Sequence, residues 1–302
     1  MQVPDLPKTR RPRMWVARSL EPLAAWPGWA DIVHETYYHR TRVRAAGSRT
    51  IVTIHDLAQE TLPEHFGADL REVLAAKAAA VRRAHAIVCV SGATRAALLD
   101  RFEVDPRRVH VVHHGCSPLP LDPAPRPIPG PYLLYVGQRR GYKNFDRLLQ
   151  AYASSGLHND VALVCFGGER PGPERATARR LGVPEARLVH VGGDDRCLAR
   201  YYAHARAFVY PSLLEGFGMP LLEAMSVGCP VICSDSSAFP EVAGEAADYF
   251  DARSVESIRA VLESCVGSDA WVARRRLDGP RRAASFSWER TALETAAVYL
   301  SC

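Results

Sequence analysis

Residues 209–233 read VYPSLLEGFGMPLLEAMSVGCPVIC and decide the fold. An apolar, β-branched run ends at Tyr210, and a loop with two glycines follows. Pro220 suits the first turn of a helix, where a missing N–H costs nothing. Gly228 and Pro230 then end that helix before another apolar run. The pattern predicts a glycine-containing loop that leads into a helix at the carboxyl edge of a parallel sheet, where open α/β sheets bind ligands.

The chemistry of this loop favours an anionic ligand. The backbone amides of Gly216, Phe217, Gly218 and Met219, together with the helix dipole, suit a diphosphate. Glu215 precedes the helix and Glu223 lies one turn inside it. Carboxylates accept hydrogen bonds from hydroxyls, so one could hold a sugar and the other a ribose. The alternative, that Glu215 caps the helix and Glu223 faces solvent, fits the spacing equally well.

A second candidate site lies in residues 132–149, YLLYVGQRRGYKNFDRLL. An apolar strand runs into Gly137, and Arg139 and Lys143 follow before the next helix. Two cations at the mouth of the same sheet would neutralise phosphate oxygens, arginine by a fork and lysine as a point charge. The alternative is a solvated loop without a ligand.

The first half of the chain carries a histidine at a strand end. Residues 51–57, IVTIHDL, deliver His55 to the carboxyl end of a β-branched strand. A histidine there can hydrogen-bond a sugar or exchange protons with it. Capping of the loop is the alternative. His113-His114 is interpreted as a strand end near a hinge rather than a metal pair, and Asp194-Asp195 as a loop and helix cap.

Apolar strands alternate with helical stretches along the whole chain, which predicts parallel sheets covered by helices on both faces. The expected strands are residues 31–34, 50–54, 86–90 and 109–113, then 132–136, 162–166, 188–191, 207–210 and 231–234. The expected helices include residues 69–83, 92–101, 144–153, 197–204 and 220–227.

Seven prolines in residues 117–131 exclude helix and central strand and indicate a linker. The predicted organisation is an N-terminal domain (1–122), a linker (123–131), a second domain (132–285) and a C-terminal helix (286–302).

Composition excludes several classes of protein. The net charge of +5 is mild, and the arginine pairs are scattered rather than clustered, so nucleic-acid binding is not expected. No apolar run approaches the roughly 20 residues of a membrane helix, and the N-terminus lacks a secretory signal. The eight cysteines form no Cys-x-x-Cys pair, which favours free thiols and a cytoplasmic protein. The basic run 8–13 leaves peripheral contact with the inner membrane surface open.

Together, these residues resemble a known family. The stretch PSLLEGFGMPLLEAMSVGCPVICSDSSAFPEVAGEAADYFD (residues 211–251) resembles the signature of the group 1 (family 4) retaining glycosyltransferases of the GT-B fold, in which two glutamates with seven residues between them flank a Gly-Phe-Gly turn. Residues 132–149 resemble the first strand of that family's second domain, with Arg139 and Lys143 at its diphosphate-binding positions. Residues 51–57 resemble the strand that carries the functional histidine, here His55. The stretch FSWERTALETAAVYL resembles the helix that crosses back to the first domain.

The resemblance implies two Rossmann-like domains that face each other across a cleft, and a nucleoside-diphosphate sugar as donor. His55, Glu215, Arg139 and Lys143 would be catalytic, with Glu215 on the transferred sugar and the cations on the diphosphate. Donor-binding residues would be Glu223 on the ribose, the turn from Gly216 to Leu221 (Gly216, Phe217, Gly218, Met219, Pro220 and Leu221), and Gly168 and Val189 beside the base. No metal and no tightly bound cofactor are implied.

One departure concerns the N-terminal domain. Family members begin with a strand and a Gly-rich loop, whereas residues 30–34 here already resemble a later strand. We therefore expect this domain to be shortened by about one βα unit. A compact variant, an edge supplied by a partner and a misplaced start are the three explanations.

Three functions follow from these patterns. The first is a retaining hexosyltransferase, with mannose the suggested sugar, that acts on a glycan, a lipid-linked sugar or a small molecule in polysaccharide biosynthesis. The second is a glycosyltransferase that decorates natural products. The third is an inactive binding or scaffold subunit, and oligomer formation stays open in all three.

Overall fold

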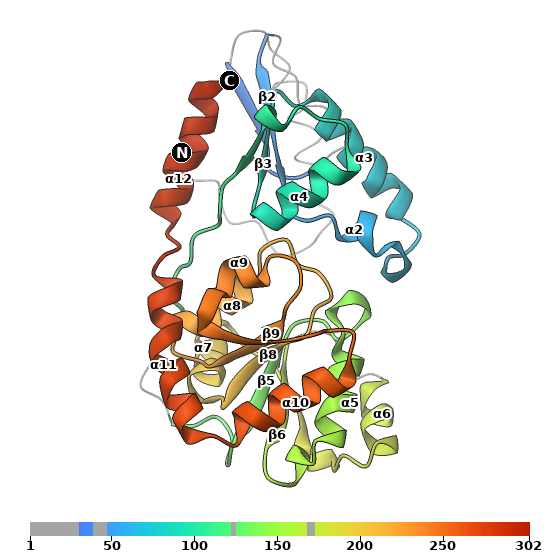
Figure 1. Ribbon diagram of the computed structural model, residues 1–302, viewed down its shortest axis with the longest axis vertical. Helices are drawn as coiled ribbons and strands as arrows, with labels where there is room; N and C mark the ends of the chain where they lie inside the picture. The colour runs from blue at the N-terminus through green and yellow to red at the C-terminus, as the bar shows by residue number, and fades with distance from the viewer. Residues whose placement is uncertain (1–29, 39–46, 122–124, 168–172) are drawn as a thin grey trace.

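The computed structural model describes residues 30–38, 47–121, 125–167 and 173–302. The basic run 8–13, the expected loss of a βα unit before residue 30, the first residues of the linker and Gly168 all lie outside these ranges. Within them, the chain forms two lobes stacked along the long axis of the molecule (Figure 1). Each lobe is a parallel sheet covered by helices, which confirms the predicted fold class.

The N-terminal lobe contains a parallel sheet with the strand order β1-β2-β3-β4. Its central strands are buried because their residues are almost all apolar or β-branched. The strands are β1 (Ile32–Glu35), β2 (Arg49–Ile54), β3 (Ala86–Cys89) and β4 (Val109–Val111). The helices are α2 (Ala58–Thr61), η1 (Pro63–His65), α3 (Leu70–Arg83), α4 (Gly92–Arg101) and η2 (Pro106–Arg108).

The C-terminal lobe contains a parallel sheet with the order β10-β9-β8-β5-β6-β7. Its strands are β5 (Tyr132–Val136), β6 (Ala162–Phe166), β7 (Leu188–Val191), β8 (Ala207–Tyr210), β9 (Val231–Ser234) and β10 (Ala247–Phe250). The α-helices are α5 (Phe145–Ser154), α6 (Glu174–Arg180), α7 (Asp195–His204), α8 (Met219–Ser226), α9 (Phe239–Ala243), α10 (Val255–Val266) and α11 (Asp269–Ala283). The short 3₁₀ turns are η3 (Gly141–Lys143), η4 (Leu157–Asn159), η5 (Glu185–Arg187) and η6 (Gly244–Ala246).

Apolar residues fill both faces of this second sheet. Tyr132 and Leu134 belong to one buried cluster, whereas Leu133 and Tyr135 belong to another on the opposite face. This alternation along a fully buried strand is typical of a parallel sheet between two helical layers. Strand β10 was missed by the sequence analysis, because its polar residues at the sheet edge interrupt the apolar run.

The order of strands places a switch point beside β5. This first strand of the lobe pairs with β6 on one side and with β8 on the other. The loops that follow β5 and β8 therefore leave the same sheet edge in opposite directions, which opens a crevice between them. Both candidate donor sites of the sequence lie in these two loops.

Helix α12 (Trp288–Ser301) packs against the sheet of the N-terminal lobe (Figure 1). Val298 joins a cluster with Ile51 and Val88, and the hydroxyl of Tyr299 lies 2.7 Å from Nδ1 of His34. Two segments thus connect the lobes, this helix and the linker before β5.

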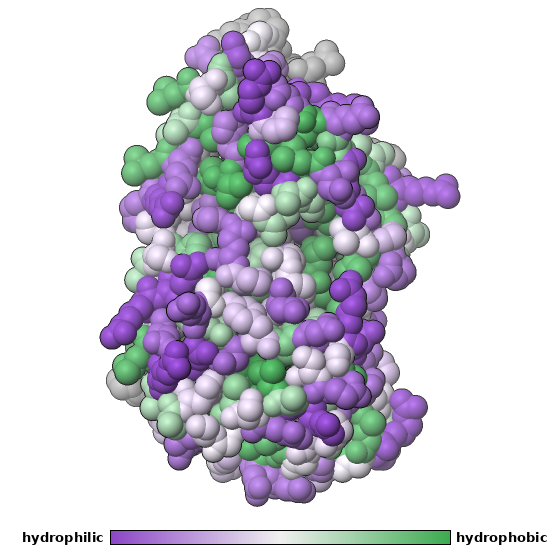
Figure 2. Space-filling view, viewed as in Figure 1, coloured by the Kyte–Doolittle hydropathy of each residue, from purple (hydrophilic) through white to green (hydrophobic). Residues whose placement is uncertain are grey.

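The surface agrees with the composition. Figure 2 shows polar residues over most of the visible face, with apolar residues in small groups between them. None of the helices in the described part of the chain is long and apolar enough to cross a membrane. All eight cysteines are free thiols.

Candidate active site

The loop after β8 lies between the two lobes. Gly216, Phe217 and Gly218 are buried there, and their three backbone N–H groups donate to no acceptor within the described residues. Gly218 adopts a left-handed conformation (φ 99°) as it starts α8. A Cβ atom on Gly218 would lie 2.9 Å from the ring of Phe239, so only glycine fits. Buried amides without a partner are rare in folded proteins and indicate a place for a ligand or water.

Lys143 and Glu215 meet at the mouth of this loop. The ammonium Nζ of Lys143 lies 2.5 Å from Oε1 of Glu215 and about 5 Å from the ring centre of Tyr142. Burial, the largest single influence, would lower the pKa of Lys143. The charges of Glu215 and Tyr142 and the hydrogen bonds to them together outweigh burial and raise the pKa above the usual value. Glu215 therefore pairs with a cation and does not cap α8, whose N-terminus has no side-chain cap.

Asn144 fixes the loop that carries Lys143. Its backbone is left-handed (φ 59°), and its side-chain amide donates to the carbonyl oxygens of Pro211 and Ala252 at 3.0 and 2.7 Å. The amide of Leu213 also donates to the carbonyl of Tyr142 at 2.8 Å. These bonds join the loops after β5 and β8 into one rigid edge.

Among the described residues, the bonds of Arg139 lead to the loop after β6 and to α6 rather than to this pair. Its Nε donates to Glu174 at 2.7 Å and its Nη1 to the carbonyl of Gly167 at 2.8 Å, with only 5% of the side chain exposed. Nε2 of His190 lies 3.2 Å from the same carboxylate oxygen of Glu174. The sequence analysis missed Glu174, because it lies on α6, 35 residues after Arg139, which is in the loop after β5.

The other predicted donor-binding residues differ in exposure. Glu223 is half-buried, and burial followed by the charge of Asp195 raises the pKa of its carboxyl. Leu221 is fully buried in the core, so its side chain packs under the turn on the protein side and does not face a ligand. Met219, Pro220 and Val189 are partly exposed.

His55 lies on the face of the N-terminal lobe that covers the turn. Its Nε2 donates to the carbonyl of Thr36 at 2.8 Å, so in the neutral ring Nδ1 carries the lone pair. Its ring stacks with that of His114 at 5.8 Å. Its own carbonyl oxygen packs so closely on Gly216 that a Cβ atom there would lie 1.5 Å from it.

Three further residues join the lobes at this place and were missed by the sequence analysis. Ser91 and Thr94, at the start of α4, donate to the carbonyl of Gly216. Glu241, on α9, accepts from the amides at the same helix start. The only sequence signal was a serine directly after a strand, which is typical of a helix cap.

The two weaker sequence candidates have structural partners. Nε2 of His113 lies 2.6 Å from Glu241, and His114 packs edge-on against Phe217. Burial, then the neighbouring histidines, lowers the pKa of His114 to about 4. Asp194 caps α7 through the amide of Cys197, as predicted.

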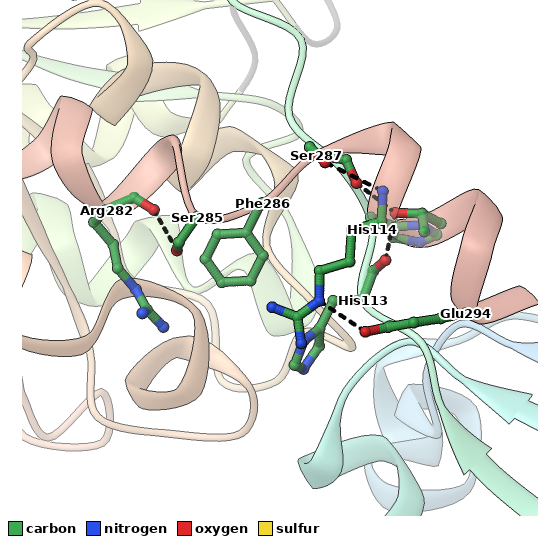
Figure 3. A pocket seen from close by; sticks show the side chains of 9 residues that line it. His113, His114, Arg282, Ser285, Phe286, Ser287 and Glu294 are labelled. Carbon is green, nitrogen blue, oxygen red and sulfur yellow. Dashed lines mark hydrogen bonds and ion pairs between the residues drawn. The ribbon is translucent and has the colours of Figure 1, made fainter.

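Both histidines also line a cavity of about 200 Å³ behind the turn, where the chain crosses between lobes (Figure 3). The side chains of Arg282, Phe286 and Glu294 surround it on the side of the crossing segment.

Two facing parallel sheets, with a turn between them whose backbone amides are available to a ligand, define the class of two-domain, GT-B glycosyltransferases. The solved structure of sucrose-phosphate synthase from Thermosynechococcus elongatus superposes on the chain with a TM-score of 0.77. That match covers 99% of this chain and 82% of that chain, at 20% sequence identity.

Sequence comparisons then give the family. Residues 2–118 match the family described as Glycosyltransferase Family 4, and residues 124–269 match Glycosyl transferases group 1. O-antigen chain mannosyltransferase B of Escherichia coli is 32% identical over 83% of this chain and 70% of its own length. The MMP alpha-(1->4)-mannosyltransferase of Mycolicibacterium hassiacum is 32% identical over 70% of this chain, which spans about half (53%) of that protein. The chain therefore belongs to the group 1, family 4 glycosyltransferases.

Proposed function

We propose that this enzyme transfers a hexose, with mannose the first candidate, from a nucleoside-diphosphate sugar to a glycan acceptor, with retention of the anomeric configuration. Two relatives at 32% identity are mannosyltransferases, and one of them is named for the O-antigen chain. This relationship favours polysaccharide assembly over natural-product decoration and over an inactive subunit.

One observation carries the proposal. The amides of the buried residues Gly216, Phe217 and Gly218 have no acceptor within the described residues, and they directly follow Glu215, which binds the ammonium of Lys143. Negative charge develops on the diphosphate as the sugar leaves, and a site of this kind stabilises it without reorganisation. The Lys143 charge and the amides at the start of α8 would supply that stabilisation.

The remaining residues would orient the donor and exclude water. Glu215 would exchange its bond with Lys143 for hydroxyls of the transferred sugar, and the carboxylate of Glu223 would hold the ribose. The N-terminal lobe closes over the turn through His55, which protects the reacting centre from hydrolysis.

Arg139 has a different proposed role. Its buried ion pair with Glu174 connects the loop after β5 to α6, and its hydrogen bond to the carbonyl of Gly167 connects the same loop to the end of β6. We assign it to support of the crevice rather than to direct contact with the diphosphate.

A donor and acceptor screen tests the proposal. The full chain is incubated with GDP-, UDP-, dTDP- and ADP-sugars and with oligosaccharides that end in mannose, and released nucleotide and product mass are measured. We expect one GDP- or UDP-hexose to be consumed and the new linkage to keep the donor's anomeric configuration by NMR.

Thermal shifts separate the competing functions. A nucleotide at a hundredfold excess over its Kd stabilises the folded state by about 2.7 kcal/mol. Stabilisation by a nucleotide without transfer to any acceptor would support the binding subunit, and transfer only to small aglycones would support the natural-product enzyme.

A further inference from the structure

The start of helix α4, in the N-terminal lobe, hydrogen-bonds the turn after β8 (residues 216–218) in the C-terminal lobe. Oγ of Ser91 lies 2.6 Å from the carbonyl oxygen of Gly216, and Oγ1 of Thr94 lies 3.1 Å from it. The two hydroxyls lie 3.1 Å apart, and their side chains are buried (0% and 3% exposed). A single backbone oxygen thus receives both hydroxyls across the lobe boundary, which fixes its direction.

The direction of that carbonyl fixes the next amide. In a trans peptide the C=O and the following N–H point to opposite sides. The carbonyl of Gly216 points to α4, so the N–H of Phe217 points away from α4. This N–H is one of the three buried donors that have no acceptor within the described residues.

Within the described residues, the C-terminal lobe donates no hydrogen bond to the carbonyl oxygen of Gly216. Glycines at 216 and 218 flank Phe217, and glycine leaves the backbone free to rotate. In the C-terminal lobe alone, the bond between residues 216 and 217 would therefore sample several directions. The hydroxyls of Ser91 and Thr94 remove that freedom only when the lobes are together.

A second contact holds α4 in place for this role. The carboxylate of Glu241 accepts from the amides of Gly92 and Ala93 at 2.8 and 3.2 Å. It also lies 2.6 Å from Nε2 of His113, which is on the segment that leads out of the N-terminal lobe. The first turn of α4 is thus bound at two points of the C-terminal lobe, the Gly216 carbonyl and Glu241.

We infer that Ser91 and Thr94 are positioning residues, which aim the Phe217 amide at the donor diphosphate and so link closure of the lobes to catalysis. The inference rests on the proposed function of the turn. The two residues touch neither donor nor acceptor and act through the Gly216 peptide. Their loss should lower kcat, since transfer takes place in the closed state, and should change nucleotide binding to the C-terminal lobe much less.

A matched pair of substitutions tests this role. Thr94→Val keeps the shape and removes the hydroxyl, whereas Thr94→Ser keeps the hydroxyl. We expect Thr94→Val to lower kcat about tenfold to thirtyfold, less than loss of an oxyanion donor itself. The Kd for the nucleoside diphosphate should stay within about threefold, and Thr94→Ser should restore most of kcat.

Ser91 needs a control for helix capping, because its side chain also accepts from the amide of Thr94. Ser254→Ala removes the same kind of cap from α10, in the other lobe. Both variants should lose stability through the missing cap, measured as a lower melting temperature. We expect only Ser91→Ala to lose turnover as well.

The inference falls if Thr94→Val keeps full turnover, if Thr94→Ser is equally impaired, or if the loss appears in Kd rather than kcat. A readout without turnover separates it from the proposed function. If the parent transfers no hexose, the function is wrong, but the Phe217 amide resonance still reports the contact. It should move in Thr94→Val and hold in Thr94→Ser, and no movement in either would overturn the inference.

Discussion

The turn of the C-terminal lobe and the face of the N-terminal lobe that covers it contribute in different ways. The turn supplies charge, through Lys143 and Glu215, and backbone amides at the start of α8 that have no acceptor in the described part of the chain. The covering face supplies position, through the carbonyl of His55 and the hydroxyls of Ser91 and Thr94. If this division is correct, changes on the turn should affect binding and chemistry together, whereas changes on the covering face should affect chemistry alone.

The largest effect should come from the charged side. We expect Lys143→Ala to lower kcat/KM about a thousandfold, because one partly buried cation on the leaving group contributes about 4 kcal/mol to the transition state. Steady-state kinetics with the preferred donor measure the loss, and circular dichroism checks the fold. Arg187→Ala removes a partly exposed arginine of the same lobe, which bonds backbone carbonyls outside the loops after β5 and β8, and should leave turnover unchanged. Equal rates for the parent and Lys143→Ala would remove the lysine from the mechanism.

Gly216 is the point where the two regions touch, so Gly216→Ala should separate them. The added Cβ would meet the His55 carbonyl at 1.5 Å, although the backbone of Gly216 lies outside the left-handed region that requires glycine. We expect the lobes to stay apart and kcat to fall about a hundredfold, with nucleotide binding to the C-terminal lobe retained. Small-angle scattering should show a larger radius of gyration. An alanine variant with parental turnover would show that closure on the turn is not needed.

The turn and the covering face also differ in how far their residues could be predicted from the sequence. The strands that flank the turn and the pair Glu215 and Lys143 follow from local patterns, because apolar runs, glycines and charges are grouped along the chain. Arg139 matched the same pattern, yet its partner Glu174 lies 35 residues away on α6, and no local spacing predicts the contact. Ser91 and Thr94 bind a backbone oxygen more than 120 residues away. A contact with a backbone atom requires no particular side chain at residue 216, so neither sequence segment predicts it.

Glu223 offers a sharper test of the donor side. Burial, then Asp195, raises the pKa of Glu223, so its ionised form is unfavourable in the folded protein at neutral pH. We expect Glu223→Gln to increase the unfolding free energy at pH 7, and the gain to disappear as the pH falls through the raised pKa toward 4.5. Donor Kd should rise about tenfold, because a neutral amide accepts more weakly from the ribose. Calorimetry measures both quantities, and a variant that is less stable yet binds normally would contradict the assignment.

Glu241 should give the smallest effect, because it holds α4 rather than the turn. Burial alone would raise its pKa, but hydrogen bonds from His113 and from the amides of Gly92 and Ala93 outweigh it and lower the pKa below 4.5. A lowered carboxyl pKa stabilises the fold above the unfolded-state value, and the gain is lost as the pH falls through the folded-state value. Glu241→Gln should therefore cost about 1–2 kcal/mol of stability at pH 7. The difference from the parent should shrink below pH 4.5, and kcat at pH 7 should fall only about threefold. A loss as large as that of Gly216→Ala would instead place the main control of closure at Glu241, and a charge of the C-terminal lobe, rather than the hydroxyls of the covering face, would then hold the lobes together.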